Sequence, residues 1–118
     1  MVLSLTLPFP EEEFRQRLTG VQEHMKERDL DVLLAYTPEN IYYLTGYNTM
    51  GYYVYQCLLV PTDHDPIMVT RRLELGNVTA GTWLDHWRTF GDTEDPVEVT
   101  CSTLVEYGFA EKVIPEFR

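Results

Sequence analysis

The stretch that decides the fold is DVLLAYTPENIYYLTGY, Asp31–Tyr47. Its first part, Asp31–Tyr36, is a short and mostly apolar run after a polar turn, which predicts a buried strand. Thr37 and Pro38 then have the residue types of a helix N-cap and of a first helical position. The short helix that they predict ends near Gly46, because glycine commonly terminates helices. A strand that leads directly into a helix is typical of a layered α/β domain.

An amphipathic helix is predicted before this stretch, from Pro10 to about Arg28. Three successive acidic residues, Glu11–Glu13, follow the proline, where the helix dipole favours negative charge. One apolar stripe recurs at steps of four, three and four residues: Phe14, Leu18, Val21 and Met25. This stripe is expected to pack against the rest of the domain.

Strands and helices continue to alternate after Tyr47. Aromatic and β-branched residues predict a strand over Tyr52–Pro61, and a turn leads from it into a partner strand over Ile67–Thr70. The remaining predicted elements are a helix over Arg71–Thr82, an edge strand over Asp85–Phe90 that Trp87 and Arg88 interrupt, a helix over Val97–Tyr107 and a last strand over Lys112–Ile114. The order predicts one α/β domain over residues 1–118, with helices packed on a sheet.

The charge of the chain excludes some classes of partner. The formal net charge is −10, with 19 acidic against 9 basic residues, so a nucleic acid or an anionic membrane surface would be repelled. No apolar run approaches the roughly 20 residues of a membrane span, and Met1–Phe9 lacks the basic leader of a signal peptide. Cys57 and Cys101 have no metal-type spacing, which favours a reducing compartment. We therefore expect a soluble, cytoplasmic protein.

Two histidine groups are candidates for chemistry. Asp63-His64-Asp65 combines ligand types of divalent metals, but the flanking Pro61 and Pro66 favour a hairpin turn. Asp85 and His86 have the types of an orienting carboxylate and a general base. No nucleophile motif accompanies them, so a structural histidine at a strand edge is the preferred interpretation. We expect no catalytic residue and no metal ligand in the chain.

Tyrosines are concentrated in one part of the sequence. Six lie close together: Tyr42, Tyr43, Tyr47, Tyr52, Tyr53 and Tyr55. Since side chains of a regular element point in different directions, about half of them are expected to face away from the core. Exposed aromatics beside a glycine-containing loop suit an interface or the wall of a ligand pocket. Packing between helix and sheet explains them equally well, and both interpretations stay open here.

The octet Asn40–Tyr47, NIYYLTGY, resembles a hallmark of the N-terminal domains of the creatinase and Xaa-Pro peptidase family, the "pita-bread" metallo-hydrolases. Weaker similarities around it extend the resemblance over most of the chain, from about Phe14 to Ile114. The resemblance implies a three-layer fold with a mixed β-sheet flanked by helices. Creatinases hold their substrate with a Phe-x-Arg pair, whose positions are Tyr52 and Val54 here. The chain is therefore more similar to prolidase-like or ectoine-hydrolase-like members than to true creatinases.

In this family the domain precedes a separate catalytic domain, which carries the metal ligands in the peptidases. The resemblance thus implies a non-catalytic domain of a C–N hydrolase of the Xaa-Pro dipeptidase type, with no cofactor in this chain and a divalent metal in the catalytic domain. The implied partners are that C-terminal catalytic domain, a second subunit in a homodimer, and a dipeptide-like or amide substrate of the full-length enzyme. The domain would help to close the partner's active site with a rim at Tyr47, Tyr52, Tyr53 and Arg71.

Two other functions stay open from the residues alone. In the first alternative, the chain is a stand-alone module whose tyrosine-rich face binds a small molecule or a protein. In the second, it is a small enzyme that uses His64 or His86.

Overall fold

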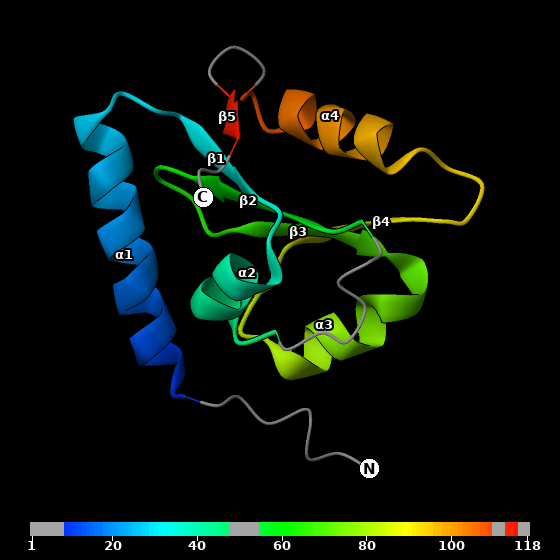
Figure 1. Cartoon of the computed structure of the whole chain (residues 1–118), viewed down its shortest axis with the longest axis horizontal. Helices are drawn as coiled ribbons and strands as arrows, with labels where there is room; N and C mark the ends of the chain where they lie inside the picture. Colours follow the sequence, from blue (N-terminus) through cyan, green and yellow to red (C-terminus); the bar gives the residue numbers. More distant parts are fainter. Residues whose placement is uncertain (1–8, 48–54, 110–112, 116–118) are drawn as a thin grey trace.

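The computed structural model describes residues 9–47, 55–109 and 113–115, and its five strands form one sheet in the order β4-β3-β2-β1-β5 (Figure 1). The strands are β1 (Val32–Ala35), β2 (Cys57–Pro61), β3 (Ile67–Arg71), β4 (Trp87–Phe90) and β5 (Val113–Pro115). The helices are α1 (Glu11–Glu27), α2 (Pro38–Thr45), the 3-10 helix η2 (Arg72–Glu74), α3 (Leu75–Gly81) and α4 (Pro96–Glu106).

The sheet is mixed, as expected from the family resemblance. β1 pairs antiparallel with β2 and parallel with β5, while β3 pairs antiparallel with β2 and parallel with β4. Among the described residues, no helix has both the length and the apolar character needed to cross a membrane.

Helices cover both faces of the sheet and make three layers. Figure 1 shows α1, α2 and α3 on one side, called here the three-helix face, and α4 on the other, called the α4 face. Because side chains alternate along a strand, Leu58 and Val60 pack on the three-helix face and Cys57 and Leu59 on the α4 face. All four side chains are fully buried, so β2 supplies both cores.

The stretch Asp31–Tyr47 folds as its sequence predicts. The hydroxyl of Thr37 accepts a hydrogen bond from the Asn40 amide (3.4 Å), and α2 starts at Pro38. Gly46 follows α2 with φ 81°, a left-handed conformation that glycine adopts without strain. The predicted stripe of α1 is also confirmed, with its first two members, Phe14 and Leu18, buried against the three-helix face.

The predicted Tyr52–Pro61 strand is too long at its start. Tyr55 and Gln56 are described but lie outside β2, which begins at Cys57. The ring of Tyr55 packs on Phe90 with ring centroids 5.9 Å apart, and its hydroxyl is 2.7 Å from the Thr100 hydroxyl. These contacts with the α4 face take the place of strand pairing.

The predicted interruption of the edge strand is wrong. Trp87 and Arg88 are the first two residues of β4, in parallel register with Met68 and Val69. Their side chains follow the period of a strand: Trp87 packs beside the core of the three-helix face, and Arg88 reaches Glu106 on α4. The apolar Trp87 and the charged Arg88 therefore fit a strand, because their side chains lie on opposite faces of the sheet. The predicted Arg71–Thr82 helix is likewise two pieces, η2 and α3, and Arg71 itself ends β3.

Candidate functional site

Tyr47, the first residue of the predicted rim, is buried and held at both ends. Its side chain is 4% exposed, and its hydroxyl donates a hydrogen bond of 2.9 Å to Oε1 of Glu74. Its amide donates to the Thr45 hydroxyl (3.0 Å), which itself donates to the Ile41 carbonyl. The end of α2 is thereby fixed against η2.

Arg71 lies at the end of β3 and turns toward the loop before α4. Its Nε donates to Oδ1 of Asp92 (3.0 Å), and Nη2 of the neighbouring Arg72 lies 3.3 Å from Oε1 of Glu94. Tyr47 contacts Glu74, the last residue of η2, while Arg71 immediately precedes η2 in the chain. The other two residues of the predicted rim, Tyr52 and Tyr53, lie outside the described residues, and the rim stays a prediction.

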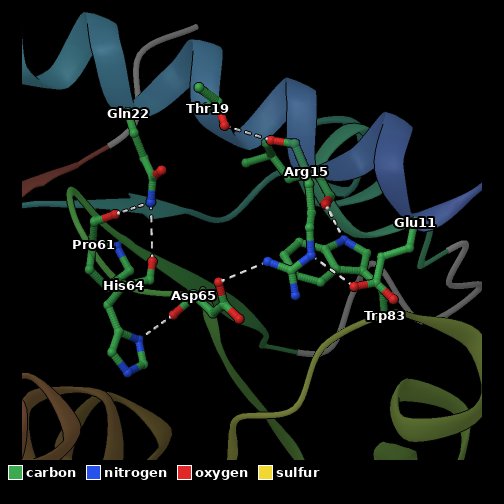
Figure 2. Close-up of polar contacts among 9 residues, drawn as sticks. Glu11, Arg15, Thr19, Gln22, Pro61, His64, Asp65 and Trp83 are labelled. Atoms are coloured by element: carbon green, nitrogen blue, oxygen red, sulfur yellow. Dashed lines mark hydrogen bonds and ion pairs between the residues drawn. The ribbon is translucent and has the colours of Figure 1, made fainter.

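A polar network connects α1 to the loop between β2 and β3 (Figure 2). Nε2 of Gln22 donates to the carbonyls of Pro61 (2.9 Å) and His64 (3.1 Å). Arg15 contacts Asp65 of the same loop at 3.3 Å and lies over the ring of Trp83, 4.6 Å from its centroid. The Asp63-His64-Asp65 triplet therefore lies in a loop held by α1, which agrees with the turn interpretation.

The structure brings together two histidines that lie 22 positions apart in the sequence, His64 and His86. The ring centroids of His64 and His86 are 4.8 Å apart, and Tyr107 packs edge-on to His64 at 5.5 Å. Nδ1 of His64 donates to the Asp65 carbonyl (2.6 Å). Within residues 9–47, 55–109 and 113–115, no group of three His, Cys, Asp or Glu side chains could hold a metal ion. The described geometry makes this an aromatic cluster.

The described tyrosines do not share one face. Tyr47 belongs to the core of the three-helix face, whereas Tyr55 packs at the α4 face. Burial raises the pKa of Tyr55 above its ordinary value, so its hydroxyl stays protonated and bonded to Thr100. Tyr43 is about half exposed on α2 and stacks with the guanidinium of Arg17, 4.6 Å from the ring centroid.

An apolar groove of about 340 Å³ lies between the C-terminal half of α1, β1 and α2. Its apolar lining comes from these three elements and from the turn between α1 and β1: Val21, Met25, Leu30, Leu33, Ala35 and Leu44. Neither Tyr47 nor Arg71 lines it. The sequence did not predict this groove. Its apolar residues Val21 in the α1 stripe and Leu33 in β1 could be recognised, but not that they are only half-buried and line a groove.

The family model described as "Creatinase/Prolidase N-terminal domain" matches residues 17–115 of the chain. The ectoine hydrolase of Halomonas elongata is 34% identical over 84 residues, which are 71% of this chain and 21% of that protein. An uncharacterised hydrolase/peptidase of Sinorhizobium fredii is 41% identical over 69 residues, 58% of this chain and 18% of that protein. The chain thus spans about a fifth of the length of these curated relatives.

Solved structures show the same fold. A proline dipeptidase from Streptococcus agalactiae superposes with a TM-score of 0.74 at 23% identity, covering 87% of this chain and 76% of that chain. One from Streptococcus pneumoniae gives a TM-score of 0.73 at 24% identity, covering 85% of this chain and 73% of that chain. At these identities the similarity establishes the arrangement of the layers.

Proposed function

The chain belongs to the creatinase/prolidase N-terminal domain family, and from this premise we propose that it is the non-catalytic domain of a C–N hydrolase of the Xaa-Pro dipeptidase type. The observation that carries the proposal is the match over most of this chain to about a fifth of larger hydrolases. The catalytic machinery, including any divalent metal, then lies in a separate C-terminal domain.

The proposal extends to a role for the domain in a cytoplasmic homodimer. It packs against its own catalytic domain and against a second subunit, and its rim closes the partner's active site over a dipeptide-like or amide substrate. The hydrogen bond from Tyr47 to Glu74 supports this, because it fixes the position of the first residue of the predicted rim. Cys57 and Cys101 are present as thiols, which agrees with a reducing compartment.

The non-catalytic character is tested on the purified chain. We expect no stoichiometric divalent metal in elemental analysis after dialysis against Mn²⁺, Co²⁺ or Zn²⁺, and no hydrolysis of Xaa-Pro dipeptides. One or two tightly held ions per chain would contradict the expected absence of a metal site. Turnover that disappears in His64→Ala or His86→Ala would mean that the chain is itself an enzyme.

Closure of the partner's site is tested by complementation in the full-length hydrolase. One subunit carries Tyr52→Ala and Tyr53→Ala with an intact catalytic domain, and the other carries an intact N-terminal domain with one metal ligand of the catalytic domain replaced. Each homodimer is expected to be nearly inactive, and mixed dimers are expected to regain activity. If mixing restores nothing while each intact domain still folds, the rim does not act on the partner subunit.

A further inference from the structure

The groove between α1, β1 and α2 has the dimensions of a small-molecule site. Its volume of about 340 Å³ lies within the roughly 300–1,000 Å³ typical of ligand pockets, which are mostly apolar with a few polar groups. Three elements line it: Met25 belongs to α1, Leu33 to β1 and Leu44 to α2. An α-helix with its side chains is about 10–12 Å across, too wide for a space of this volume.

The charge of the lining sets this groove apart from the rest of the molecule. The chain has 19 acidic residues, yet none of the ten described residues that line the groove carries a carboxylate. Two other hollows differ: one contains Asp29, Asp31 and Asp63, and the other contains Glu94, Asp95, Glu98 and Glu106. An anionic group is therefore repelled less at this groove than at those hollows.

One cation in the groove lining has no ion-pair partner among the described residues. Five arginines of the described residues form ion pairs with carboxylates: Arg15, Arg17, Arg71, Arg72 and Arg88. Arg28, which follows α1 and lines the groove, has no such partner in the part of the chain that the structure describes. A guanidinium presents a planar set of donors that fits a carboxylate in a bidentate geometry.

We propose that the groove between α1, β1 and α2 binds a small apolar carboxylate, with the aliphatic or aromatic body between Met25, Leu33 and Leu44 and the carboxylate on Arg28. The groove lining also includes the polar side chains of His24, Asn40 and Tyr43. Of these, His24 and Asn40 offer further contacts to the carboxylate of the ligand. Of the predicted rim residues, Tyr47 and Arg71 do not line this groove, and the proposal does not depend on the role of the domain in a hydrolase.

The experiment is a titration of the chain with decanoate, followed by amide chemical shifts in NMR. We expect saturable binding in about the millimolar range, as for a small ligand in a half-open site, with shifts concentrated on α1, β1 and α2. Decanol is the matched ligand without the carboxylate. Arg28→Gln is expected to weaken decanoate binding about threefold, the size of a solvent-exposed ion pair, and to leave decanol binding unchanged.

Matched variants separate the site from nonspecific effects. Lys26→Gln removes an equally unpaired cation of the described residues from the same helix end, outside the groove, and is expected to leave decanoate binding unchanged. Val21→Trp fills the groove and is expected to abolish binding of both ligands. Leu73→Trp adds the same bulk at a residue that is 72% exposed elsewhere and is expected to have no effect.

Three results would overturn the proposal. Binding that does not saturate, or that survives Val21→Trp in a variant with an unchanged melting temperature, means that the groove is not the site. Equal losses for Arg28→Gln and Lys26→Gln mean that general charge attracts the ligand. Absence of binding in a longer protein that contains this domain, with binding to the chain alone, means that a protein segment covers the groove.

Discussion

A buried tyrosine hydroxyl must keep a hydrogen-bond partner, because an unsatisfied polar group in a core costs free energy. Tyr47 meets this requirement with a partner that is distant in sequence: it lies just after α2, whereas Glu74 lies at the end of η2, after β3. Glu74 Oε1 also lies 3.4 Å from Nδ2 of Asn77. One carboxylate therefore joins the end of α2, η2 and the first turn of α3.

Tyr47→Phe is expected to lower the free energy of unfolding by about 1–2 kcal/mol, because it removes a buried hydroxyl that donates to a carboxylate. Urea unfolding monitored by circular dichroism measures the change. Tyr43→Phe is the control: Tyr43 is about half exposed, and its loss is expected within about 0.5 kcal/mol. Equal changes in the two variants would show that the Tyr47–Glu74 hydrogen bond contributes nothing specific.

Between elements, one ion pair joins the edge strand to the helix that covers it. Nε of Arg88 on β4 lies 3.3 Å from Oε1 of Glu106 on α4, and the Arg88 guanidinium also packs over the ring of Tyr107. The hydrogen bond from Arg88 holds the pKa of Glu106 below its ordinary value. The folded chain therefore binds a proton at Glu106 less readily than the unfolded chain does.

The stability that Glu106 contributes is expected to depend on pH. It is fully present above the ordinary pKa of a glutamate and is lost as the pH falls through the lowered pKa of the folded state. Melting temperatures of the wild type and of Glu106→Gln, measured from pH 7 down to pH 3, should differ at neutral pH and converge in acid. The difference is expected to be small, because the pair is exposed to solvent, and a constant difference across this range would contradict the assignment.

Elements defined by local signals are predicted from sequence, and those defined by distant contacts are not. The N-cap at Thr37, the terminator at Gly46 and the stripe of α1 are properties of neighbouring residues. The course of β4 is not, because only its pairing with β3 decides that Trp87 and Arg88 continue the strand. The same pairing, with Met68 donating to the His86 carbonyl, puts His86 beside His64, a contact that no spacing in the sequence indicates.

At the scale of the whole molecule, β2 belongs to two cores at once. Leu58 faces the three-helix face and Leu59 the α4 face, and both are fully buried. A substitution that disrupts the packing of either core therefore destabilises the same strand, β2. The layer order follows from the alternation of strands and helices in the sequence, whereas the groove beside β1 depends on how closely α1 and α2 approach, which the sequence pattern does not specify.

Leu58→Ala and Leu59→Ala are each expected to lower the free energy of unfolding by about 2–5 kcal/mol, the usual cost of removing a buried leucine side chain and leaving a cavity. Leu73→Ala, at a residue that is 72% exposed, is expected to change it by less than about 0.5 kcal/mol. Chemical denaturation of the three variants measures these values. A mild loss at only one of the two buried positions would mean that the core on that side rearranges to fill the space.

The pairing of β1 with β5 determines when the fold can be completed during synthesis. Val32 pairs with Val113, so one edge of β1 has to wait until almost the whole of these 118 residues has left the ribosome. The hairpin of β2 and β3 joins residues close in sequence and forms early, while such distant pairing closes late. Through most of the synthesis of these 118 residues, this edge of β1 therefore lacks its β5 partner, and an unpaired strand edge is a site at which other chains can pair.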